Sequence, residues 1–202
     1  MTKAHISVAH IMLAVSMLLL TAPLKAQFKE TAVPDYYLQY VPLVTGVGLG
    51  WTGVSAEHRG LDRVMVAGVG FVSEAVIVNA LKYTVKEQRP DGSAHNSFPS
   101  GHSATAFLGA EIVRHEYGWG WGAGAYAVAT GVAALRVYHK RHYWWDTAAG
   151  AACGVLSANI GYWMLPPLHR LLHIPEDSVE VSLAPCYDPL SGSFGPAFSF
   201  RF

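Results

Sequence analysis

Long apolar stretches recur along most of this chain and constrain its fold more than any other feature. Four of them cover residues 41–56, 64–81, 119–135 and 147–165, and a shorter one covers residues 103–113. None alternates apolar and polar residues as a half-buried strand would, and each is long or apolar enough for a buried or membrane helix. The sequence therefore predicts an all-α fold, a bundle of five to six helices embedded in a membrane.

Composition supports a membrane protein. Charged residues make up only 14% of the chain, against about 25% in soluble proteins. The formal net charge is zero, so no global field favours nucleic acid, and we expect no nucleic-acid partner. Glycines four residues apart, such as Gly150 and Gly154, let helices approach closely inside a bilayer.

The two ends of the chain differ from its middle. Residues 1–26 hold a short apolar run and end in Ala26, which fits either a cleaved secretory signal or an uncleaved first transmembrane helix. Both alternatives place Gln27 outside the cytoplasm. Residues 166–202 follow two prolines and show partial alternation around a DPLSG turn, which predicts a β-hairpin. The expected division is thus 1–26, a helical domain over 27–165, and a tail over 166–202.

Threading the helices from an external Gln27 places residues 82–100 and 136–146 together on the outer side. The loops that this assigns to the cytoplasm hold few Lys or Arg, which the positive-inside rule does not favour. The basic residues of the two external regions therefore need a functional explanation.

The first external region contains two polar clusters. In KYTVKEQRP, Lys82 and Arg89 are two helical turns apart and share a face with Lys86 if the helix continues to Pro90. In PSGH, Ser100 suits a helix N-cap, and the helix start would offer unpaired N–H groups to an anion. Gly101 allows close approach of a ligand, and His102 can transfer a proton near neutral pH. Taken singly, the first cluster could also be a solvated basic helix end, and the second a capped helix start with an incidental histidine.

The third cluster is RVYHKRHYWWD, which contains Arg136, His142 and Asp146. His142 and Asp146 are four positions apart, so on a helix the carboxylate could orient the imidazole. An ordinary helical pair and a zinc site are the alternatives. Lys82, Arg89 and Arg136 would repel a dication, and no third ligand has a convincing spacing, so an anion site is favoured.

Together, Lys-x6-Arg-Pro, Pro-Ser-Gly-His and Arg-x5-His-x3-Asp resemble the signature of the type-2 phosphatidic acid phosphatase superfamily over about residues 64–165. The membrane branch is most similar, including enzymes that act on lipid A, undecaprenyl diphosphate or phosphatidylglycerol phosphate. The resemblance implies that His142 is the nucleophile, Asp146 orients it, and His102 is the acid and base. It also implies phosphate-binding roles, without metal or cofactor, for Lys82, Arg89, Ser100, Gly101 and Arg136. One departure is Leu135, because the family usually has Ser there.

The resemblance and the external threading imply a lipid phosphate phosphatase of a bacterial-type inner membrane, multi-pass, with its active site facing the periplasm. A vanadium-dependent haloperoxidase, a soluble acid phosphatase and a catalytically silent protein that binds lipid phosphates are the alternatives. Outside the three clusters, Glu74 is a functional or a hydrogen-bonded structural residue, and Glu111 is expected to pair with Arg114.

Overall fold

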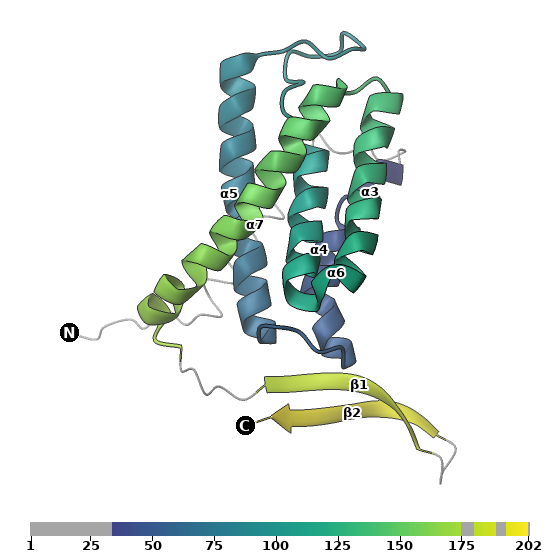
Figure 1. The fold of residues 1–202 in the computed structure, drawn as a ribbon, viewed down its shortest axis with the longest axis vertical. Helices are drawn as coiled ribbons and strands as arrows, with labels where there is room; N and C mark the ends of the chain where they lie inside the picture. Colours follow the sequence, from purple (N-terminus) through teal and green to yellow (C-terminus); the bar gives the residue numbers. More distant parts are fainter. Residues whose placement is uncertain (1–33, 175–179, 189–192, 202) are drawn as a thin grey trace, which may run out of the picture.

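The computed structural model describes residues 34–174, 180–188 and 193–201 of the 202-residue chain. The predicted signal or first helix over 1–26 lies outside the described residues. The helical bundle that the sequence predicts is confirmed (Figure 1). Its helices are α3 (Pro34–Leu38), α4 (Val41–Gly48), the 3₁₀ helix η1 (Leu49–Thr52), α5 (Gly60–Val85), α6 (Gly101–Tyr138) and α7 (Trp144–Leu172).

Helix α6 unites two of the predicted helices, and a sharp kink at Gly118 separates them. Gly118 has φ 75° and ψ −177°, a conformation that glycine adopts without the steric penalty of a Cβ. We call residues 101–117 the N-terminal arm and residues 119–138 the C-terminal arm. The arms run back along each other, so α6 begins and ends at the same end of the bundle (Figure 1).

Three helix ends differ from the expectation. The helical segment that starts at Val41 ends at Thr52, before Gly53 with φ 93°. Helix α5 ends at Val85 and is capped by Lys86 in the left-handed conformation, so the condition that it continues to Pro90 is not met. Helix α7 passes through Pro166 and Pro167 and ends at Leu172, so the change of structure comes after the prolines rather than at them.

Close helix contacts hold α7 against the N-terminal arm of α6. A Cβ at Gly150 would collide with the Ser100 carbonyl oxygen, and one at Gly154 would collide with that of Ala104. The expected role of this small-residue pair is therefore confirmed, and it brings the start of α7 onto the start of α6. The core beneath it contains Leu108, Ile112, Val66 and Ala158.

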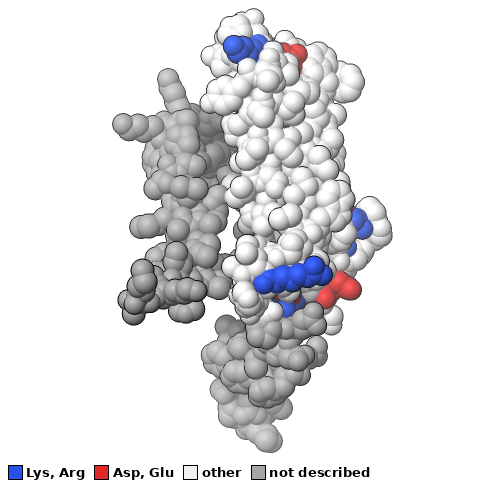
Figure 2. Space-filling model, turned by 90° about the vertical axis from the view of Figure 1, so that its left-hand side faces the viewer, with Lys and Arg blue, Asp and Glu red and all other residues white. Residues whose placement is uncertain are grey.

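Helices α5 and α7 are long and apolar enough to cross a membrane. Figure 2 shows a face on which Lys, Arg, Asp and Glu lie toward the two ends, while a broad zone between them carries none. Apolar side chains exposed on these two helices include Val72, Val76, Leu156 and Trp163. Such a band fits a hydrocarbon environment.

The tail forms the predicted β-hairpin. Strands β1 (Glu180–Asp188) and β2 (Ser193–Arg201) pair antiparallel, with Glu180 opposite Arg201. The hairpin lies at the end of the bundle near η1 (Figure 1).

Candidate active site

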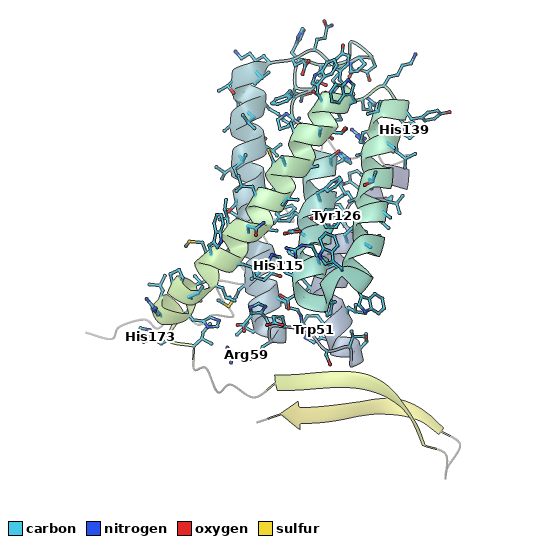
Figure 3. All side chains as sticks on the ribbon, in the orientation of Figure 1. Trp51, Arg59, His115, Tyr126, His139 and His173 are labelled. Atoms are coloured by element: carbon cyan, nitrogen blue, oxygen red, sulfur yellow. The ribbon has the colours of Figure 1, made fainter. Side chains whose placement is uncertain are left out.

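Four helix ends bring the three predicted clusters together. The C-terminus of α5, both ends of α6 and the N-terminus of α7 lie at one end of the bundle (Figure 1). We call this the site end, and in Figure 3 it is the end near the labelled His139. Sequence positions more than fifty residues apart, such as Lys82 and His142, therefore lie at the same end of the bundle.

Ser100 is the N-cap of α6, as predicted. Its Oγ accepts from the Ser103 backbone N–H at 3.4 Å and from the Ser103 hydroxyl at 3.1 Å. Its own N–H donates to the Asp146 carbonyl oxygen at 2.9 Å, which ties α6 to α7. Gly101 follows as the first residue of α6, so its N–H lies at the positive end of the helix dipole.

His142 and Asp146 meet, although not on one helical face as the spacing suggested. Helix α7 begins only at Trp144, and Asp146 lies in its first turn, where its Oδ2 accepts from the Tyr143 N–H at 2.9 Å. His142 precedes the helix, and its Nδ1 lies 3.5 Å from the same Oδ2. Both side chains are almost fully buried. The carboxylate thus faces Nδ1, and Nε2 is the ring nitrogen turned away from it.

Ser97 is a site residue that the sequence analysis missed. Its buried hydroxyl donates to Asp146 Oδ2 at 2.5 Å, and its backbone N–H donates to the Glu87 carbonyl oxygen at 2.9 Å. Asp146 Oδ2 is therefore held by a hydroxyl and a backbone N–H besides its approach to His142. The only sequence signal was the position of Ser97 in the loop just before Pro99.

The loop after α5 brings Lys82 and Arg89 together, because the helix itself does not reach Arg89. Lys82 Nζ donates to the Asn96 carbonyl oxygen at 2.7 Å, and Arg89 Nε donates to the Asn96 side-chain oxygen at 3.0 Å. Asn96, also missed from the sequence, thus positions both cations. Lys86, expected on the same face, is exposed at the helix C-cap.

Four side chains from the three clusters lower the pKa of His142. Burial, and after it the positive charges of Arg136, Lys82, Arg89 and His102, together lower the pKa of the His142 imidazole from 6.5 to about 2. These five side chains, from all three clusters, are therefore close enough to interact electrostatically. The result is a neutral imidazole surrounded by cations, an arrangement that an anion would stabilise.

Arg136 and His102 come to this site from the two ends of α6. Arg136 is 2% exposed, and its carbonyl oxygen accepts from the N–H groups of Arg141 and His142. That contact shapes the loop that carries the nucleophile candidate. His102 is half-buried in the first turn of α6, with its ring 6.0 Å from that of Tyr36 in α3.

Other polar residues lie at the rim of the site or within the bundle. Arg141 forms an ion pair with Asp91 at 3.2 Å, and Trp145 donates to Glu87 at 3.0 Å. Glu74 is buried and accepts from Thr105 at 3.4 Å. The expected Glu111 and Arg114 pair is confirmed, and the guanidinium binds both carboxylate oxygens, at 2.8 and 2.7 Å.

Comparison with known proteins identifies the family. The PAP2 superfamily model matches residues 63–170, more than half of the chain. The chain therefore belongs to the PAP2 superfamily, which the sequence clusters had indicated. The matched region contains the three clusters and the helices α5 to α7 that present them.

Individual relatives share parts of the chain. A protein named lipid A 1-phosphatase from Porphyromonas gingivalis is 36% identical over 141 residues, covering 67% of this chain and 32% of that protein. The bacitracin transport permease protein BcrC of Bacillus licheniformis is 38% identical over 96 residues, 45% of each chain. This chain thus spans less than half the length of either curated relative.

A solved structure shares the fold. The crystal structure of Aquifex aeolicus LpxE superposes with a TM-score of 0.51 at 22% identity, covering 64% of this chain and 83% of that one. At this identity the likeness concerns the fold alone, and it agrees with the helical bundle described above.

Proposed function

We propose that this protein is a lipid phosphate phosphatase that hydrolyses a phosphate ester or anhydride at the outer face of a membrane. The observation that carries the proposal is the buried, neutral His142, oriented toward Asp146 and surrounded by Lys82, Arg89, Arg136 and His102. Membership of the PAP2 superfamily and the similarity to a protein named lipid A 1-phosphatase support it. Lipid A is accordingly the first substrate to test.

In the first step, His142 Nε2 attacks phosphorus while Nδ1 keeps its proton toward Asp146. An N–P bond forms and the P–O bond to the lipid breaks, giving a phosphohistidine. The leaving oxygen takes a proton from protonated His102. The present separation of 3.5 Å between Nδ1 and the carboxylate shortens as positive charge develops on the ring, because catalytic hydrogen bonds often tighten only with substrate bound.

In the second step, water attacks the phosphorus of the phosphohistidine. His102 takes a proton from that water, the N–P bond breaks, and inorganic phosphate leaves. Throughout, the phosphoryl oxygens are held by the cations and by the helix start. The groups we assign to this binding are Lys82, Arg89, Arg136, the Ser100 hydroxyl and the Gly101 N–H. None of the roles assigned to these residues requires a metal ion.

The external position follows from the predicted threading and from the lipid substrate. A phosphate headgroup lies where the hydrocarbon zone ends, and the site end lies at the ends of the two apolar helices α5 and α7. We propose an inner-membrane protein whose site faces the periplasm. A cysteine introduced at the exposed Lys86 tests this side directly, because its alkylation in intact spheroplasts shows whether it faces outward.

The activity is tested by phosphate release from lipid A, undecaprenyl diphosphate, phosphatidylglycerol phosphate and a soluble monoester, with His142→Ala as the control. We expect release from at least one lipid by the wild type, persistence in chelators, inhibition by vanadate, and no release by the variant. An acid-labile phosphate label on His142 would identify the intermediate. Strict dependence on an added metal, or full activity of His142→Ala, contradicts the mechanism.

The same phosphate pocket could hold vanadate in a haloperoxidase, which the sequence left as an alternative. The apolar helices argue against it, because that alternative describes soluble proteins. Peroxide-dependent halide oxidation by vanadate-loaded protein, without phosphatase activity, would replace the present proposal.

A further inference from the structure

A lateral groove lies between α7 and the C-terminal arm of α6. Its volume is about 560 Å³, within the range of about 300–1,000 Å³ that is common for ligand sites. We define the lateral groove by six of its lining residues: Phe107 and Tyr126 of α6, and Ala152, Leu156, Asn159 and Trp163 of α7. The lining surface is predominantly apolar, so its natural occupant is a hydrocarbon.

The lateral groove lies between two helices whose connecting segment belongs to the candidate active site. The C-terminal arm of α6 and helix α7 are joined by the short segment 139–143 at the site end, and they diverge from there (Figure 1). This segment carries His142, and Arg136 lies in the last turn of the C-terminal arm. Tyr126 lies farther down, between the arm and α7 (Figure 3). The groove therefore lies between the same two helices whose connection carries His142.

The length of the lateral groove fits a lipid chain. Ala152 follows Asp146 by six positions, so its part of the groove lies about 9 Å below the site along α7. It continues to Trp163, a further rise of about 16 Å. One leaflet of a bilayer has a hydrocarbon depth of about 15 Å, half the thickness of the core. The rise of the groove along α7 therefore matches the hydrocarbon depth that one acyl chain covers.

From this geometry we infer that the lateral groove binds an acyl chain of the substrate lipid and that Ala152 leaves the space for it. The inference rests on the proposed phosphatase function and adds a binding site for the hydrocarbon part of the substrate. Ala152 is exposed, so a larger side chain there occupies the groove without disturbing the core. The chain contributes binding energy in the ground state and in the transition state alike, which affects KM more than kcat.

The test compares lipid A with its fully deacylated disaccharide phosphate, which keeps the headgroup and lacks the chains. In Ala152→Phe, we expect KM for lipid A to rise about tenfold, as for the loss of contact with a few methylene groups, with little change in kcat. Hydrolysis of the deacylated substrate stays at the wild-type rate, which also reports an intact fold. Val76→Phe is the matched control, because Val76 is 64% exposed on α5 and outside the groove.

Other outcomes separate the inference from the function. Equal losses on both substrates, no loss on either, or a change of oligomeric state in Ala152→Phe would each overturn the groove assignment while leaving the phosphatase intact. Absence of phosphate release by the wild type from both substrates would instead refute lipid A hydrolysis, and the acyl-chain assignment with it.

Discussion

The two ends of the bundle use the same kinds of residue in opposite ways. At the site end, Lys82, Arg89 and Arg136 surround His142, and the buried carboxylate beside them is Asp146. At the other end, which we call the paired end, the carboxylates of Asp62 and Glu116 each face basic side chains. Figure 3 places the labelled Arg59, His115 and His173 toward the paired end, away from His139.

Individual contacts define the paired end. Asp62 accepts from Arg59 at 3.1 Å and lies 2.7 Å from His169. Glu116 lies 3.1 Å from the His58 ring and accepts from the Tyr162 hydroxyl at 2.7 Å. The Glu116 carbonyl also accepts from the Glu57 N–H. These contacts tie the segment before α5 and the end of α7 to the kink of α6.

The pKa values of His58 and His142 shift in opposite directions because of this contrast in charge pairing. The hydrogen bond to Glu116 raises the pKa of His58, whereas burial and neighbouring cations lower that of His142. A matched cluster of charges stabilises the fold, while a surplus of one sign costs stability unless a ligand of opposite charge is bound. The surplus of positive charge around His142, rather than the number of charged residues, therefore marks the site for an anion.

The largest contrast is expected between the two carboxylates that face a histidine. Asp146→Asn removes the charge that orients His142, and we expect phosphate release to fall by about 10²–10⁴-fold, the usual worth of a placed proton-transfer group. Asp62→Asn, its counterpart at the paired end, leaves turnover near the wild-type value. Initial rates of phosphate release from the same lipid substrate measure both. Similar losses in the two variants would erase the distinction between the ends.

Removal of a single cationic side chain is expected to cause a smaller loss of activity. Arg89→Gln removes a charged hydrogen-bond donor to the phosphate, and we expect kcat/KM to fall by about 10–100-fold. Arg59→Gln at the paired end changes kcat/KM little, because Arg59 contacts Asp62 rather than substrate. Vanadate inhibition provides a second readout, since it weakens in the Arg89 variant alone. Unchanged vanadate inhibition in Arg89→Gln would argue against a phosphate contact.

The paired end is expected to govern stability. Glu116→Gln weakens the buried contacts to His58 and Tyr162, and we expect the free energy of unfolding to fall by about 1–3 kcal/mol. Thermal unfolding in detergent measures the loss, while turnover at a temperature where the variant is folded stays near that of the wild type. A fall in kcat at that temperature would show that the paired end also takes part in catalysis.

The pH dependence of stability should separate the ends by sign. The pKa of His142 is about 2 in the fold and about 6.5 in an unfolded chain. The unfolded state therefore binds more protons below about pH 6.5, and the wild type loses about 1.4 kcal/mol per pH unit from this group. His142→Gln removes that loss, which unfolding curves at about pH 7 and about pH 5 can detect. Identical pH slopes in the two proteins would contradict the buried neutral state.

The smallest expected effect has the opposite sign at His58. Its raised pKa means that its stabilising contribution is complete below the unfolded value of about 6.5 and is lost as the pH rises through the folded value. His58→Gln should therefore be destabilised at low pH and approach the wild type at high pH. Melting temperatures across this range measure it, and a constant difference would show that the charge of His58 plays no part.

Local pattern predicted the helices well and their ends less well. Apolar length indicated the segments, and the Ser100 N-cap and the tail hairpin followed from side-chain chemistry that acts over a few residues. The continuation of α5 to Pro90 failed, because the sequence has no strong stop signal where Lys86 adopts the left-handed conformation. Likewise, the union of two helices at Gly118 depends on the packing of both arms.

The sequence by itself determined the chemical inventory of this protein: apolar helices, a capped helix start, and three clusters whose residue types suit a phosphate. Only the tertiary structure decided which groups hold them in place. Ser97 binds Asp146, and Asn96 binds Lys82 and Arg89, contacts that no spacing rule could indicate. The physical reason is that residue type fixes what a side chain can bind, whereas its partner depends on how distant helix ends meet.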